Sequence, residues 1–316
     1  MILCCGEALI DMLPAETADG RAGFVPVPGG AVFNTAIALA RLGVRAGLLS
    51  GLSSDGFGQL LRETLHAEGV DTALSVVTDR KTALAFVFLS DAQAHYSFHD
   101  EGSAMRLLGI DQIPALPDHV RALFFGGISL ACEPCGRALE ALRARAGDGR
   151  VTMLDPNVRP AFVRDEAAYR ARLGRMMGQS DIVKCSDEDL AWLVPEAPTL
   201  ESRMASILDL GPALVVVTRG REGALARSVS GVAVSVPAKA VRVVDTVGAG
   251  DTFNAGLLAK LRECGALERG CLRALDRDVL TAALHHGVAA AAFAVTKAGA
   301  HSPRAEELAQ GNFERG

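Results

Sequence analysis

The sequence predicts an α/β protein in which a mostly parallel sheet is covered by helices on both faces. Short β-rich apolar runs alternate with amphipathic helical stretches along the 316 residues, and this order is typical of right-handed crossovers between parallel strands. The runs are apolar throughout, as expected for strands that are buried on both sides. In chain order, we expect strands at residues 1–5, 46–49, 122–125, 151–154, 181–183 and 214–218.

Helical periodicity fills the intervals between these strands. Ala36, Leu39 and Ala40 fall on one face of the first predicted helix, and the others repeat this pattern. The expected helices span residues 32–42, 57–67, 137–145, 167–177, 252–263 and 279–295.

Two segments, residues 12–27 and 82–98, are not followed by a helix. The first has Gly and Pro near both ends, and the second alternates like a hairpin that turns at residues 90–93. The two can pair as a separate small sheet, which we expect to be a lid drawn from about residues 12–27 and 82–100. Two surface hairpins without a role remain the alternative. No repeat or linker divides the chain, so we expect one domain over residues 1–316.

Composition excludes several classes of protein. With 49% hydrophobic residues and a net charge of −5, the chain has the composition of a globular protein and lacks the basic excess of nucleic-acid binders. No basic segment precedes the first apolar run, and no apolar run approaches the length of a membrane span. We therefore expect a cytoplasmic protein with no nucleic-acid or membrane partner. The seven cysteines are expected to be free thiols, because Cys132 and Cys135 have no second pair of metal ligands.

The strongest motif is the run VDTVGAGDTF at residues 244–253. We expect a strand to end at about Val244 and a helix to begin near Gly250, with glycines where the backbone turns. The unpaired N–H groups of the first helical turn, with the helix dipole behind them, form an anion site suited to a phosphoryl group. Asp251 either caps this helix or accepts a proton from an attacking hydroxyl.

A second glycine turn, Gly29–Gly30, is followed by Asn34 one turn into a predicted helix. The glycines let the backbone approach a small polar ligand, and Asn34 can both donate and accept hydrogen bonds. By itself this pattern favours an ordinary glycine turn that leads into a helix, because such turns are common.

The two motifs together resemble the signatures of the PfkB (ribokinase-like) family of carbohydrate kinases. DTVGAGDTFNAG is similar to the second signature, and PGGAVFNTA followed by ALARLG is similar to the first, in the family's order. The resemblance implies a three-layer α/β/α fold with a small β-sheet lid and ATP-dependent transfer of phosphate to a primary hydroxyl of a sugar. It also implies that Asp251 is the catalytic base and that Gly248, Ala249 and Gly250 form the anion hole.

The resemblance extends to residues that would bind the sugar. Asp11, in GEALID, would accept two sugar hydroxyls, although a solvated loop acid is the alternative. Arg159, in DPNVR, would steady hydroxyls, a carboxylate or phosphate charge, and a plain surface arginine is the alternative. The implied sugar-binding set is Asp11, Gly29, Gly30, Asn34, Phe98 and Arg159.

Residues 217–224 (VTRGREGA) resemble the family's nucleotide segment, in which glycines let ribose and phosphate lie against the backbone. The implied ATP-binding set is Lys184, Thr218, Gly220, Gly223, Gly250 and His286.

The metal sites are implied by the family as well. Where relatives have N-x-x-E, this chain has SDED, so that either Glu188 or Asp189 would serve Mg²⁺ through water. A monovalent cation, K⁺, is implied at Asp245, Val247, Ala294, Lys297 and Gly299.

Residues 96–104 and 125–130 look most like the bacterial family members that phosphorylate fructose. The alternative substrate is 2-keto-3-deoxygluconate, which carries a carboxylate. Relatives that act on it usually have an extra arginine near the lid, and the nearest arginine here is Arg106.

From other classes, a catalytically inactive sugar sensor remains open. A dinucleotide-dependent oxidoreductase lacks G-x-G-x-x-G after the first strand, and no P-loop motif exists. Relatives often pair through their lids, so a homodimer is possible.

Overall fold

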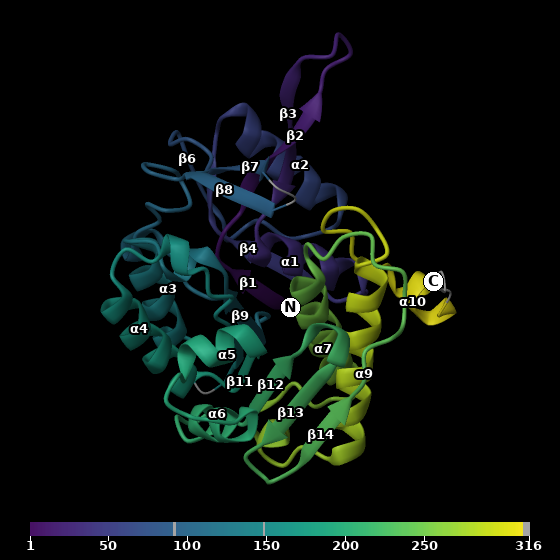
Figure 1. Ribbon diagram of the computed structural model, residues 1–316. Coiled ribbons are helices and arrows are strands. Elements are labelled where there is room, and N and C mark those ends of the chain that lie inside the picture. Colours follow the sequence, from purple (N-terminus) through teal and green to yellow (C-terminus); the bar gives the residue numbers. More distant parts are fainter. Residues whose placement is uncertain (91–92, 148, 312–316) are drawn as a thin grey trace.

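The computed structural model describes residues 1–90, 93–147 and 149–311. Its centre is an eight-stranded sheet in the order β14-β13-β12-β11-β10-β9-β1-β4 (Figure 1). The strands are β1 (Ile2–Cys5), β4 (Ala46–Leu49), β9 (Ala122–Gly126), β10 (Val151–Asp155), β11 (Ile182–Ser186), β12 (Leu214–Thr218), β13 (Ala224–Ser228) and β14 (Ala233–Val236). The six strands from β4 to β12 are parallel, and β13 and β14 add an antiparallel edge.

Helices cover both faces of this sheet. They are α1 (Ala31–Arg41), α2 (Gly56–Ala67), α3 (Cys135–Arg145), α4 (Glu166–Gln179), α5 (Asp187–Leu193), α6 (Leu200–Leu208), α7 (Ala249–Glu263), α8 (Arg269–Arg273), α9 (Arg277–Ala294) and α10 (Ala305–Gln310). One core joins Ile2 and Cys4 to α1, α2, α7 and α9, and the other joins Leu3 and Cys5 to α3, α4 and α6. Alternate residues of β1 therefore enter different cores, and the predicted three-layer α/β/α class is confirmed.

Four strands form a separate smaller sheet in the order β3-β2-β7-β8. They are β2 (Leu9–Glu16), β3 (Ala22–Gly29), β7 (Leu84–Ser90) and β8 (Gln93–His99). The β2–β3 hairpin projects from the body in Figure 1. Both segments assigned to the lid by sequence thus lie in one sheet, while residues 91–92 of the expected turn fall outside the described residues. A short parallel pair, β5 (Gly51–Ser53) and β6 (Val76–Thr78), completes the strands named for the described chain.

The expected strand ending at Val244 is wrong. The strand before α7 is β14, which ends at Val236, and residues 237–248 form neither strand nor helix. Val243 and Val244 are more than half exposed, so their β-branched side chains did not indicate a buried strand.

Among the described residues, no helix has the length and apolar character needed to cross a bilayer.

Candidate active site

The motif at residues 244–253 forms the entry to helix α7. Gly248 is the N-cap, in the left-handed region with φ 74°, and a Cβ there would lie 2.7 Å from the Cβ of Ala300. Both facts require glycine at this position. Of the residues predicted to form the anion hole, Ala249 donates its N–H to the Thr246 carbonyl at 3.3 Å. The N–H groups of Gly250 and Asp251 lie in the first turn, where no helical carbonyl precedes them. Their placement, with the positive end of the α7 dipole, provides a site for an anion.

Asp251 faces a second helix that begins beside α7. Asn34, in the first turns of α1, donates from Nδ2 to Asp251 Oδ2 at 2.9 Å, although the two residues are 217 positions apart. Burial raises the pKa of Asp251 to about 7, while the Asn34 hydrogen bond opposes this shift and nearby Asp155 adds to it. A carboxyl whose pKa lies near neutrality is suited to general-base catalysis.

A buried ion pair lies beneath the entry to α7. Lys184 Nζ donates to Asp155 Oδ2 at 2.9 Å, and Asn254 Nδ2 donates to the same oxygen at 2.7 Å. A Cβ on Gly250 would lie 3.3 Å from Lys184 Nζ, so the ammonium lies against the first turn of α7. Burial alone would lower the pKa of Lys184, but the surrounding carboxylates of Asp155, Asp189 and Asp251 outweigh it, and the pKa is raised.

Asp11 lies within β2 and not at the carboxyl end of β1, the first strand of the central sheet. Its side chain passes over Gly29 of the neighbouring strand β3, where a Cβ would overlap its carboxylate. Burial raises the pKa of Asp11 to about 6. Gly29 thus has a definite steric role: it leaves room for the acid that sequence analysis assigned to the sugar.

The remaining residues assigned to the sugar lie at the small sheet and after β10. Asp11 pairs with Ala85, which pairs with Phe98, so all three are on one face of the small sheet. The Phe98 ring packs edge-on against the Phe162 ring with centroids 3.9 Å apart. Arg159 is exposed, and its guanidinium donates to the Val158 carbonyl at 3.0 Å.

The residues assigned to ATP are divided between two places. Thr218 ends β12, and Gly220 and Gly223 follow it with φ 48° and 93°. A Cβ on Gly223 would overlap the Val236 carbonyl, which explains that glycine by backbone crowding. His286 belongs to α9, and its Nδ1 lies 2.9 Å from the Gly256 carbonyl of α7. Thr218 and the glycines lie at the carboxyl end of the sheet, whereas His286 joins two helices.

The two acids assigned to magnesium differ in their surroundings. Glu188 is exposed. Asp189 is buried, and its carboxylate accepts the N–H groups of Val158 at 2.9 Å and Ser186 at 3.1 Å. Asp189 therefore caps the start of α5 and ties it to the loop after β10. Among the described residues, no three His, Cys, Asp or Glu side chains cluster as direct ligands of a metal ion.

The segments assigned to a monovalent cation do meet. Asp245 Oδ1 accepts the Val247 N–H at 3.0 Å, and Oδ2 accepts the Gly299 N–H at 2.8 Å. Ala294 ends α9, and its carbonyl accepts the Lys297 N–H at 3.1 Å. These contacts hold the loop before α7 against the chain that follows α9.

Sequence analysis missed two buried residues near these groups, Asn254 and Glu7. The Oδ1 atom of Asn254 is buried without a hydrogen-bond partner among the described residues, and the same holds for Oδ1 of Asp155, whose Oδ2 accepts a hydrogen bond from Asn254. Glu7, in the connection between β1 and β2, is 1% exposed and accepts three hydrogen bonds. An acid between Gly6 and an apolar run was the available signal, because such an acid needs a buried partner.

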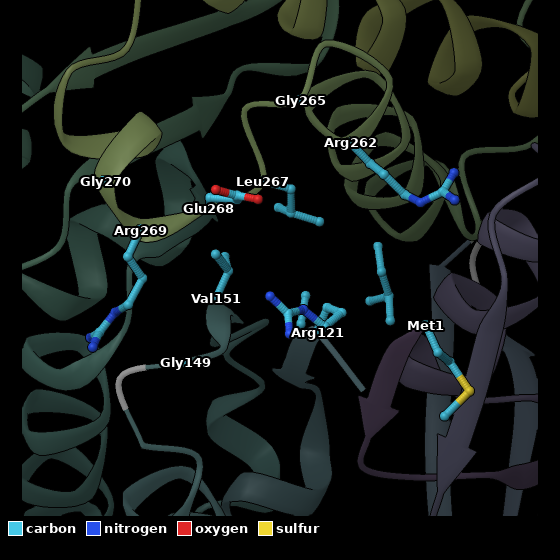
Figure 2. Close-up of a pocket in the computed structure, with 12 residues that line it drawn as sticks. Met1, Arg121, Gly149, Val151, Arg262, Gly265, Leu267, Glu268, Arg269 and Gly270 are labelled. Atoms are coloured by element: carbon cyan, nitrogen blue, oxygen red, sulfur yellow. The ribbon is translucent and has the colours of Figure 1, made fainter. Parts of the chain in front are cut away.

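A cavity of about 510 Å³ lies elsewhere, at the amino ends of β1, β9 and β10 (Figure 2). Arg121, Arg262, Glu268 and Arg269 line it, and it contains none of the residues assigned to catalysis or binding. Open α/β sheets bind their ligands at the carboxyl ends of the strands. We therefore place the candidate active site at the start of α7 and not in this cavity.

Known proteins share both the sequence pattern and the fold of this chain. The model of the pfkB family of carbohydrate kinases matches residues 1–307. A fructokinase of Rhizobium leguminosarum bv. trifolii is 48% identical over 280 residues, which cover 89% of this chain and 85% of that protein. A Xylella fastidiosa fructokinase structure with bound ATP has a TM-score of 0.88 at 28% identity, covering 98% of this chain and 97% of the other.

A second solved structure shows the same fold with other ligands. It is a double mutant of a Vibrio cholerae O395 fructokinase with fructose, ADP and a potassium ion, with a TM-score of 0.82 at 28% identity, covering 97% of this chain and 94% of the other. The family match over nearly the whole sequence and the high identity to a relative of similar length agree with the two signatures. The chain belongs to the pfkB family of carbohydrate kinases.

Proposed function

We propose that this carbohydrate kinase is a fructokinase, which transfers the γ-phosphate of ATP to a primary hydroxyl of fructose. The observation that carries the proposal is the pairing of Asp251 with Asn34 at the start of α7. This pairing places a carboxyl of near-neutral pKa beside an anion site. The named fructokinase relatives support the choice of sugar.

The transfer requires a base and a receptor for negative charge. Asp251 accepts the proton of the sugar hydroxyl, whose oxygen forms the new bond to the γ-phosphorus as the bond to the bridging oxygen of ADP breaks. The first-turn N–H groups of Gly250 and Asp251 stabilise charge on the moving phosphoryl group. The Lys184 ammonium, which lies against Gly250, adds a fixed positive charge.

Asp11, Gly29, Gly30 and Asn34 hold the sugar in the proposed complex, with Phe98 and Arg159 at its edge. The small sheet carries Asp11 and Phe98 on one face. Its closure over the sugar excludes water, which would otherwise accept the phosphate. Thr218, Gly220 and Gly223 line the ATP side, and His286, also assigned to ATP, joins α9 to the Gly256 carbonyl of α7.

The charges near Lys184 suit the Mg²⁺ that accompanies ATP. Asp155, Asp189 and Asp251 place three carboxyl groups around one ammonium, and Asp155 Oδ1 is a buried acceptor with no described partner. Asp155 and Asp189 would hold magnesium through water. When bound, the ion neutralises charge on the β- and γ-phosphates. Exposed Glu188 is the weaker of the two acids considered.

We also propose a K⁺ site in the loop before α7. Carbonyl oxygens at Val247, Ala294, Lys297 and Gly299 and the carboxylate of Asp245 are the candidate ligands. The contacts of Asp245 with Val247 and Gly299 bring these segments together. The potassium ion named for the Vibrio cholerae protein supports this assignment.

The surroundings of Arg106 favour fructose over 2-keto-3-deoxygluconate. Its guanidinium donates to Asp100 at 2.5 Å, and both side chains are largely buried. Arg106 is therefore already neutralised and is not offered to the carboxylate of a sugar acid. This was the arginine nearest the lid in the sequence.

Association through the lid is a further part of the proposal. Phe24, Val25 and Phe88 of the small sheet are each more than one-third exposed, and apolar exposure of this kind suits a second copy of the chain. Sedimentation velocity at micromolar concentration tests this: a dimer is expected, and a Phe88→Asp variant should be monomeric.

An ADP-release assay with fructose, 2-keto-3-deoxygluconate, ribose, tagatose and adenosine tests the proposed activity. We expect the highest kcat/KM with fructose. A higher value with another sugar would replace fructose as substrate. Binding of fructose without ADP release at any sugar concentration would instead support the inactive sensor.

A further inference from the structure

We infer that Glu7 is a positioning residue that fixes the start of helix α1, and with it the sugar-binding glycines and Asn34. This inference rests on the proposed function, because it concerns the same site. Glu7 lies in the connection between β1 and β2, is 1% exposed, and touches neither Asp11 nor Asp251 by any hydrogen bond found among the described residues.

Glu7 caps α1 from outside the helix. The Ala31 N–H donates to Glu7 Oε1 at 3.1 Å, and the Phe33 N–H donates to the Glu7 backbone carbonyl at 3.2 Å. The N-cap of α1 is Gly30, which has no side chain to offer, and the first turn contains no acid. Glu7 therefore supplies both the acceptors and the negative charge that a helix start normally receives from local residues.

The other carboxylate oxygen of Glu7 holds a third segment. Ser129, which follows β9, donates to Oε2 from its N–H at 3.2 Å and from its hydroxyl at 2.7 Å. One carboxylate thus joins the β1–β2 connection, the start of α1 and the chain after β9. The backbone N–H groups of Ala31 and Ser129 each need one carboxylate oxygen as acceptor, and the Ser129 hydroxyl lies between Oε2 and the Gly126 carbonyl, 3.0 Å away.

Glycines clear the space that this carboxylate occupies. Gly127 has φ 74°, and a Cβ there would overlap Glu7 Oε1. Gly30 has φ 109°, and a Cβ there would lie 3.0 Å from Glu7 Cγ. Two glycines beside one buried acid, each with positive φ, show that the adjoining segments are packed for that side chain.

Burial of the Glu7 carboxylate is unfavourable, and the contacts that oppose it are hydrogen bonds from Ser129 and Ala31. Burial accordingly raises the pKa of Glu7, against the effect of its hydrogen bonds. The fixed start of α1 in turn determines the positions of residues at the proposed sugar site. Gly29 and Gly30 immediately precede the capped turn, and Asn34, in the next turn, donates to Asp251. Displacement of the α1 start would move both sugar contacts and the partner of the base.

A Glu7→Gln variant tests the inference, because the amide keeps the shape but presents an N–H₂ group either to the Ala31 N–H or to the Ser129 N–H and hydroxyl. We expect the KM for fructose to rise about tenfold or more, as lost charged hydrogen bonds imply. The KM for ATP should stay within about twofold, since no bond of Glu7 reaches the nucleotide segment at residues 217–224.

Asp181→Asn is the matched control. Asp181 is a buried acid that accepts hydrogen bonds from Thr152 and Arg269, but it lies just before β11, at the opposite end of the strand from Ser186. We expect this variant to lower the melting temperature without changing the KM for fructose. Equal effects of the two variants, with the KM for fructose unchanged in both, would show that Glu7 is only structural and overturn the inference.

Ser129→Ala keeps the test decisive where Glu7→Gln does not fold. It removes the hydroxyl that donates to Oε2 at 2.7 Å and that also reaches the Gly126 carbonyl at 3.0 Å, and it leaves the cap on Ala31. The KM for fructose should rise about threefold; an unchanged KM would contradict the inference. Wild-type protein that phosphorylates another sugar in place of fructose overturns the proposed substrate alone, because the same comparison is then made with that sugar. Inactivity toward every sugar would overturn both.

Discussion

Replacement of Asp251 by asparagine separates the chemistry of the base from its effect on stability. An asparagine Oδ1 still accepts the hydrogen bond that Asn34 now gives to Asp251, so the local geometry is retained. The amide cannot accept the proton of the sugar hydroxyl. Loss of a general base implies that kcat falls about 10²- to 10⁴-fold, while the Kd for fructose should change little.

The same substitution should make the protein more stable above neutral pH. The pKa of Asp251 rises from 3.8 to about 7 on folding, so the folded state keeps a proton that the unfolded state has already released. Stability of the wild type therefore falls as pH rises between these values, and the loss is complete above pH 7. From pH 5 to about 7 this amounts to about 3 kcal/mol, at 1.36 kcal/mol per pKa unit. The Asp251→Asn variant escapes this loss.

Two measurements check these expectations. An ADP-release assay at saturating ATP and fructose gives kcat, and urea denaturation at pH 5 and pH 8 gives the free energy of unfolding. The variant should be nearly inactive, and its stability relative to wild type should increase from pH 5 to pH 8. A variant that retains near-normal kcat, or one whose relative stability is the same at both pH values, would refute the assignment of Asp251 as a buried base.

Three further predictions follow from contacts around the site. Gly29→Ala should raise the KM for fructose at least about tenfold and leave the KM for ATP unchanged, because its Cβ would overlap the Asp11 carboxylate; steady-state kinetics with each substrate varied would show an equal change in both if this were wrong. Lys184→Met leaves Asp155 as a buried carboxylate without its cation and should lower the free energy of unfolding by about 3–5 kcal/mol; an unchanged urea midpoint would contradict this. Exchange of potassium chloride for tetramethylammonium chloride at constant ionic strength should lower kcat, because the loop tied by Asp245 would lose its cation; equal rates in both salts would exclude the K⁺ site.

The central strands were predictable because strands that are buried on both faces are apolar at every position. The strand expected at residues 214–218 is β12 (Leu214–Thr218) in the structure, buried over most of its length. The antiparallel edge was missed because β13 and β14 alternate buried and exposed residues and contain Arg227 and Ser235. The strand predicted to end at Val244 is wrong because valine has a strong β propensity, yet this side chain is exposed and lies outside the sheet.

The candidate site was predictable only as separate motifs. Sequence spacing indicated two helix starts, but the hydrogen bond between Asn34 and Asp251 depends on how α1 and α7 pack. Glu7 was missed because its partners come from α1 and from the chain after β9, far from it in sequence. The position of an acid between Gly6 and an apolar run indicates burial, but the linear pattern does not show which distant segments that acid holds.

The pH dependence of kcat, compared between wild type and an Asn34→Ala variant, tests the central claim most directly. The hydrogen bond from Asn34 lowers the pKa of Asp251, which burial otherwise raises to about 7. At saturating ATP and fructose, kcat of the wild type should rise with pH to a plateau above about 7, and in the variant this rise should move to higher pH. A rise that stays at the same pH in both proteins, as ionisation of ATP would give, or a rate independent of pH would contradict Asp251 as the base.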